Sequence, residues 1–155
     1  MIRSICLWLA KYLPSFTIPD NNGDPYLTRY YFFGKDRWFG NIYLHHFHRS
    51  DMDRSANGIL LLHDHPWSGL SFILLGGYEE ERANKIWWQY VERRTVKPLT
   101  FNVLRTDYYH RVDLLEQDAW SIFFTGPRSK KRSWGFWDRI TNEYRDFTTK
   151  PTAIP

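Results

Sequence analysis

Histidine is the residue type whose spacing in this chain most clearly suggests chemistry. The six histidines form two clusters and one isolated position: His45, His46, His48, His63, His65 and His110. Residues two apart on an extended strand project from the same face, so His63 and His65 are expected to point together and Asp64 to point the other way. Imidazole suits Fe, Ni, Zn, Cu and similar divalent metals. The pair could therefore converge on one cation, or it could be two histidines satisfied by their surroundings.

The elements that must position these side chains are predicted to be short strands. Segments rich in aromatic and β-branched residues alternate with turns, beginning after the turn signal at 21–25. The predicted strands are Leu27–Phe33, Asn41–His48, Gly58–His65, Leu70–Gly76, Tyr78–Ala83, Ile86–Val96, Leu99–Arg105, Arg111–Leu115, Ala119–Thr125 and Ser133–Trp137. No long helical pattern follows residue 13. This series favours an all-β sandwich or barrel.

The start of the chain has a different pattern, with apolar residues at helical spacing before Pro14. The residues on this stripe are Ile2, Ile5, Leu9, Tyr12 and Leu13. They predict a short amphipathic helix over 1–14 that packs on the barrel. The apolar run 5–10 is too short for a membrane span and lacks a cleavage site for secretion. We therefore expect a soluble, cytoplasmic protein without a membrane partner.

Composition limits the class of protein further. A chain of 155 residues suits one compact domain, and 43% hydrophobic with 25% charged residues is typical of globular proteins. Aromatic residues make up 19%, which suits ring-lined pockets. The single cysteine, Cys6, excludes an internal disulfide and a Cys-rich zinc site.

The positive charge of the chain is local. The formal net charge is +4, and residues 126–150 alone hold seven basic and three acidic side chains, which is the same balance. A local excess points to a phosphate or other anion more than to duplex nucleic acid, although a solvated loop would look the same. The candidate ligand-binding residues there are Arg128, Lys130, Lys131 and Arg132.

Several segments together resemble one known superfamily. They are 25–31, 43–45, 47–51, the run His63-Asp64-His65-Pro66-Trp67, 125–127 and 134–136. The chain resembles the cupins, in particular small uncharacterised cupins of bacteria and their phages that share the His-Asp-His-Pro-Trp motif. The resemblance covers roughly residues 25–137.

This resemblance implies a double-stranded β-helix, or jelly-roll barrel, within a single domain over 1–155, with the barrel at 25–147. It also implies one divalent transition metal (Fe, Mn, Ni or Zn) near the barrel mouth. His63 and His65 match the first cupin motif and His110 matches the histidine of the second. Gly69 and Leu70 stand where the first motif usually has Glu, so a three-histidine site is expected.

Other residues are candidates to complete the site. His48 ranks first as a fourth ligand, because its strand should neighbour His63, and Glu80 ranks second. Glu80 and Tyr78 are the candidate general acid or base. Trp67 could roof the pocket or serve as a core residue.

Three functions fit these features. The first is a metal-dependent enzyme, with dioxygenase-type chemistry for a redox-active ion and hydrolysis or isomerisation otherwise. The second is a non-catalytic binder of a nucleotide or sugar phosphate, which in a phage could act on a host signalling nucleotide. The third is a structural role as a homodimer with exposed aromatic residues at its interface.

Overall fold

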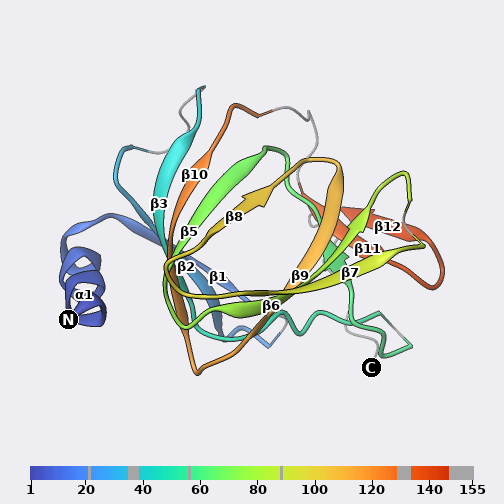
Figure 1. Ribbon diagram of the computed structural model, residues 1–155, viewed down its shortest axis with the longest axis horizontal. Coiled ribbons are helices and arrows are strands. Elements are labelled where there is room, and N and C mark those ends of the chain that lie inside the picture. Colours follow the sequence, from blue (N-terminus) through green and yellow to red (C-terminus); the bar gives the residue numbers. More distant parts are fainter. Residues whose placement is uncertain (21, 35–38, 56, 88, 129–133, 147–155) are drawn as a thin grey trace.

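The computed structural model describes residues 1–20, 22–34, 39–55, 57–87, 89–128 and 134–146. Its described strands form two antiparallel sheets of six that face each other (Figure 1). The first sheet has the order β1 (Ser15–Pro19), β2 (Pro25–Tyr31), β3 (Asn41–Phe47), β10 (Ala119–Thr125), β5 (Gly69–Leu75) and β8 (Phe101–Leu104). The second has the order β12 (Glu143–Asp146), β11 (Gly135–Asp138), β4 (Leu62–His63), β9 (Tyr108–Leu114), β6 (Tyr78–Asn84) and β7 (Val91–Val96).

The order of strands confirms the predicted all-β jelly roll. Strands far apart in sequence are neighbours: β10 lies between β3 and β5, and β4 lies between β9 and β11. Such crossing between two sheets is the pattern of a jelly roll. The chain enters the first sheet earlier than the sequence predicts, because β1 at Ser15–Pro19 pairs with β2.

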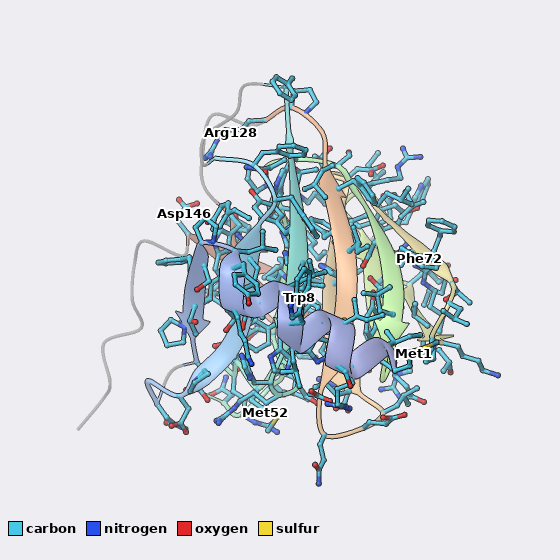
Figure 2. All side chains as sticks on the ribbon, turned by 90° about the vertical axis from the view of Figure 1, so that its left-hand side faces the viewer. Met1, Trp8, Met52, Phe72, Arg128 and Asp146 are labelled. Carbon is cyan, nitrogen blue, oxygen red and sulfur yellow. The ribbon has the colours of Figure 1, made fainter. Side chains whose placement is uncertain are left out.

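The helix α1 (Ile2–Tyr12) lies across the outer face of the first sheet (Figure 2). Its buried side contains Cys6, which is 1% exposed and packs with Leu44 and Trp120. Ile5 and Tyr12, predicted on the packed stripe, are 51% and 71% exposed. The predicted helix is confirmed, but its buried face is rotated, because the contacts are made by Ile2, Cys6, Leu9 and Ala10 at i, i+4, i+7 and i+8. No helix in the described residues is long and apolar enough to cross a membrane.

The strand that carries the first histidine pair is shorter than the predicted Gly58–His65. The strand consists of Leu62 and His63: both pair with β11, and His63 also pairs with His110 of β9. Pro66 follows soon after and has no backbone N–H to give to a ladder. His65 therefore lies just beyond the strand, in the segment that leads to β5.

Candidate metal centre

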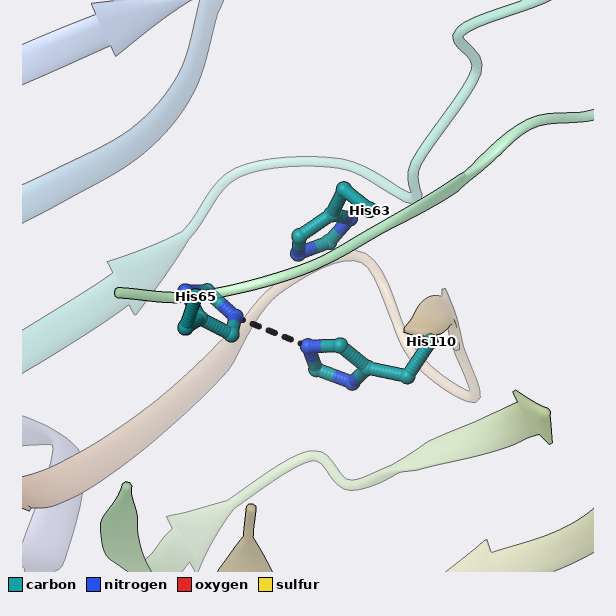
Figure 3. A group of neighbouring side chains, drawn as sticks. All are labelled: His63, His65 and His110. Atoms are coloured by element: carbon teal, nitrogen blue, oxygen red, sulfur yellow. Dashed lines mark hydrogen bonds between the residues drawn. The ribbon is translucent and has the colours of Figure 1, made fainter. Parts of the chain in front are cut away.

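Three histidines, carried by β4, by the residues just after β4 and by β9, converge on one point (Figure 3). His63 on β4 and His110 on β9 are directly opposite in the register, and His65 follows two residues after His63. One ligand atom from each lies within 4.8 Å of the others. The Nε2 atoms of His65 and His110 are 2.9 Å apart.

Residues on either side of His63 hold the backbone in place. Leu62 is fully buried against Ala83 and Trp137. Asp64, also fully buried, points the other way from the histidines, as predicted. Its carboxylate pairs with Lys85 Nζ at 2.5 Å and accepts a hydrogen bond from the Gly135 backbone N–H at 3.1 Å. This alternation leaves His63 and His65 on the same side of the chain.

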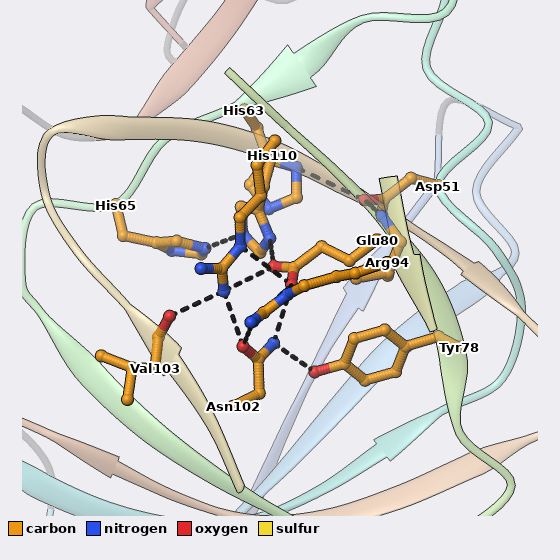
Figure 4. A network of polar contacts seen from close by, with 11 residues as sticks. Asp51, His63, His65, Tyr78, Glu80, Arg94, Asn102, Val103 and His110 are labelled. Atoms are coloured by element: carbon orange, nitrogen blue, oxygen red, sulfur yellow. Dashed lines mark hydrogen bonds and ion pairs between the residues drawn. The ribbon is translucent and has the colours of Figure 1, made fainter. Parts of the chain in front are cut away.

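A buried carboxylate orients His110 from behind (Figure 4). Glu80 on β6 is fully buried, and its Oε1 lies 2.8 Å from Nδ1 of His110. Its Oε2 pairs with Arg82 Nε at 2.9 Å and accepts hydrogen bonds from Arg94 Nε at 3.0 Å and Asn102 Nδ2 at 3.1 Å. Burial by itself would raise the pKa of Glu80, but the His110 hydrogen bond and the charges around it lower the pKa to about 2. Glu80 is therefore an ionised partner of His110.

A second carboxylate stands beside His63. Oδ2 of Asp51 lies 3.5 Å from Nδ1 of His63 and also accepts the backbone N–H of Val112 at 2.8 Å. Burial lowers the pKa of His63 to about 4, even though the negative charge of Asp51 acts to raise it. Burial, together with the two neighbouring imidazoles, also holds the pKa of His65 well below its usual value. His63 and His65 are thus neutral near pH 7, which is the form that binds a metal.

The arrangement fits one divalent transition ion. Two imidazole nitrogens that each lie about 2.1 Å from one ion are about 3 Å apart when their bonds are at right angles, close to the spacing of His65 and His110. With Nδ1 of His110 turned to Glu80 and Nδ1 of His63 turned to Asp51, Nε2 of each ring is left for an ion. A metal-bound histidine in proteins usually donates its other ring N–H to a carboxylate or carbonyl. Glu80 stands at hydrogen-bond distance from His110, as that rule requires, and Asp51 is the nearest carboxylate to His63 Nδ1, at 3.5 Å.

These histidines line one side of a cavity between the two sheets. Its other walls include Tyr78, Phe123, Asp20 and Met52. Burial, followed by the charge of Glu80, raises the pKa of the Tyr78 hydroxyl, which accepts a hydrogen bond from Asn102 at 2.8 Å. Tyr78 therefore keeps its proton at neutral pH.

Comparisons with known proteins match the fold and not the sequence. No protein-family model matches this sequence, and no curated protein does. Three solved structures illustrate the likeness. The lyase DddQ of Ruegeria pomeroyi DSS-3 has a TM-score of 0.58 at 11% identity over 85% of this chain and 64% of that one. Streptomyces PAC13, solved with uridine, has a TM-score of 0.56 at 6% identity over 86% and 94%. Fe(II)-HppE has a TM-score of 0.55 at 11% identity over 74% and 56%.

The chain has the cupin fold. Identities this low establish the fold alone, and the chain spans only about half the length of HppE (56%). The predicted cupin architecture is confirmed by the likeness and by the two sheets.

Within this cupin barrel, His48 does not join the histidine group. The alternation along β3 puts it on the outer face with His46, where their ring centroids are 4.0 Å apart. Its Nε2 forms a hydrogen bond with Thr28 Oγ1 at 2.8 Å. The prediction of His48 as a fourth ligand is wrong, because the outer face of the first sheet lies away from the cavity.

The remaining predicted residues are placed as follows. Glu80, predicted as a general acid or base, is not among the residues that line the cavity. Its carboxylate contacts His110, so in the structure it is a positioning residue for that ring. Trp67 packs on His65 with ring centroids 4.5 Å apart. Arg128 is exposed, and Lys130, Lys131 and Arg132 lie outside the described residues.

Two residues that the sequence did not single out belong to this site. Asp51 supports His63, and His45 lines the cavity from β3. The period of two in β3 showed that His45 points opposite to His46, but not which face is inside. Asp51 lies in a polar loop, where no periodic pattern marks a buried side chain.

Proposed function

We propose that the protein is a metal-dependent enzyme. His63, His65 and His110 would hold one divalent transition ion, and a small substrate would enter the cavity beside them. The observation that carries this proposal is the convergence of three imidazoles within 4.8 Å, two of which have buried carboxylates at Nδ1. Three neutral ligands leave coordination positions for water or substrate.

Each residue has a distinct part in this proposal. Glu80 and Asp51 fix the orientation of His110 and His63, and Tyr78 offers a protonated hydroxyl to a substrate in the cavity. The ion, when bound, would supply Lewis acidity, or redox chemistry if it is iron. The aromatic walls exclude water from the substrate.

The test is elemental analysis of protein loaded in turn with Fe(II), Mn, Ni and Zn under reducing conditions. We expect near-stoichiometric metal in the wild type and little in the double variant His63→Ala/His110→Ala. His48→Ala is the matched control, because it removes an imidazole outside the group and should retain the metal. A wild type that holds none of the four ions would overturn the proposal.

A non-catalytic binder of a nucleotide or sugar phosphate is the second candidate. It is favoured by the basic balance of 126–150 and the exposed side chain of Arg128. Phosphate binding that is independent of metal, and is lost when residues 128–132 are neutralised, would support it over the enzyme.

A further inference from the structure

Three polar side chains form a row across the inner face of the first sheet. Arg29 on β2 is the register partner of His45 on β3, and His45 is the partner of Ser121 on β10. Directly paired residues of antiparallel strands lie side by side on one face, with Cβ atoms about 5 Å apart. Arg29 and His45 line the same cavity as the three histidines of the metal centre. Arg29 and His45 therefore face that centre from the opposite sheet, and Ser121 lies beside His45 on the same face.

Each member of this row has a buried polar atom without a hydrogen-bond partner. These atoms are Nε of Arg29, Nε2 of His45 and Oγ of Ser121, and among the described residues none of them has a donor or acceptor in reach. Nδ1 of His65, at the metal centre, is in the same condition. Buried polar groups in native proteins are nearly always paired, so three exceptions from residues that line one cavity (Arg29, His45 and His65), with Ser121 as the register partner of His45, call for an explanation.

Arg29 is the most demanding of the three, because it carries a charge. No hydrogen bond or ion pair connects its guanidinium to an acidic side chain in the described part of the chain. Its neighbours are aromatic: the guanidinium carbon lies 5.7 Å from the ring centroids of both Tyr43 and Trp67. Those rings hold the side chain in place by cation–π contact without neutralising it.

The rest of the row is held rigidly. The ring of His45 stacks with those of Tyr43 and Phe123, at centroid distances of 5.5 and 4.8 Å. Trp67 touches both Arg29 and His65, so one ring joins the row to the metal centre. A polar site that is preorganised in this way needs little rearrangement to receive a ligand.

We propose that the Arg29–His45–Ser121 row is the substrate-recognition site of the enzyme, and that the substrate is a small organic molecule with a carboxylate or phosphate group. This inference rests on the metal-dependent function proposed above. The guanidinium fork matches the oxygens of either anion, and His45 and Ser121 add further polar contacts. The apolar body of the ligand would pack on Phe123, Phe47 and Val112, which also line the cavity.

The experiment is isothermal titration calorimetry with three probes of similar shape: benzoate, phenyl phosphate and the neutral benzamide. Each is titrated into metal-free and zinc-loaded wild type, because an anion could otherwise bind to the zinc itself. We expect at least one charged probe to bind metal-free protein about tenfold or more tightly than benzamide, the range typical of a hydrogen bond to a charged group. The stronger of the two charged probes distinguishes a carboxylate from a phosphate site.

Variants then locate the site. Arg29→Gln should weaken the charged probe about tenfold or more and leave zinc affinity unchanged, and Ser121→Ala should weaken it to a smaller extent. Lys97→Gln is the matched control, because it removes one positive charge from an exposed position. Charged probes that bind no better than benzamide, or that bind Arg29→Gln as well as the wild type, would overturn the proposal. Anion binding through Arg29 in a chain that takes up no metal would remove the enzyme function and leave the anion site standing.

Discussion

Glu80 provides the most direct test of how the candidate metal centre is supported. Its carboxylate is fully buried and contacts four polar side chains at once: His110, Arg82, Arg94 and Asn102. Glu80→Gln keeps the size of the side chain and one carbonyl oxygen, which can still accept the proton of His110 Nδ1. It removes the negative charge and replaces the other oxygen with an amide N–H2 group that faces guanidinium donors.

The magnitude follows from these contacts in two parts. Loss of a carboxylate behind a metal-bound histidine typically weakens metal binding about 10- to 100-fold, which is about 1.4–2.7 kcal/mol. Removing one partner of a buried ion pair typically costs about 3–5 kcal/mol of stability. The Arg94 side chain is 34% exposed, so water can solvate part of its charge. We therefore expect about 3 kcal/mol, the lower end of that range, for the metal-free variant.

The assay is zinc titration against a competing chromophoric chelator, together with urea denaturation of the metal-free protein. Glu79→Gln is the control, because Glu79 is exposed on the outward face of the same strand and should change neither quantity. Suppose that Glu80→Gln binds zinc within twofold of the wild type while His110→Ala does not bind it. The orienting contact between Glu80 and His110 would then be unimportant to the site.

Three further predictions concern stability. Zinc at 100 times its dissociation constant should raise the free energy of unfolding by about 2.7 kcal/mol in urea denaturation, and a chelator or the variant His63→Ala/His110→Ala should abolish this gain. Burial and the charge of His48 lower the pKa of His46 from 6.5 to about 4, although the hydrogen bond to Asp118 raises it in part. The unfolded chain therefore takes up more protons below pH 6.5. Stability should fall between pH 7 and 5, and His46→Gln should reduce that fall by about 2 kcal/mol; an unchanged pH profile would contradict the buried, neutral state of this ring. On α1, Leu9→Ala should cost about 2 kcal/mol and Ile5→Ala less than about 0.5 kcal/mol, because only Leu9 packs on the sheet. Equal losses of stability in the two variants would mean that Ile5 is buried as well, as the sequence predicted.

Much of the fold could be predicted from local pattern. Segments rich in aromatic and β-branched residues, bounded by turns, predicted the strands at 41–48 and 78–83 that correspond to β3 and β6, and the period of two of a strand places Tyr78 and Glu80 on one face, where both are buried. Asp64 was correctly placed opposite the histidine pair for the same reason. The three histidines that the structure brings together were predicted from the spacing of His63 and His65 and, for His110, from the cupin resemblance. Strand period and motif spacing are local properties, so one sequence is enough to read them.

What the sequence could not provide is the identity of the inner face. In β3, Leu44 packs against α1 and His46 stacks on Trp120 on the same outer face, while His45 faces the cavity. Both faces carry histidine and apolar residues, so their hydrophobicity does not distinguish them. Because α1 covers the outer face, that face also carries apolar residues and resembles an interior face in sequence. The prediction of His48 as a ligand failed for this reason.

The same argument explains why β3 needs its outer contacts. A slip of one residue along a strand exchanges its two faces, which would bring His46 into the cavity and remove His45 from it. The ring of His46 is stacked on Trp120 at 3.9 Å, and its Nε2 pairs with Asp118 at 2.9 Å. Asp118 in turn accepts a hydrogen bond from Arg3 of α1 at 2.7 Å. This chain of contacts outside the barrel fixes the register inside it. His46, on the outer face of the first sheet, therefore helps to decide that His45 faces the cavity.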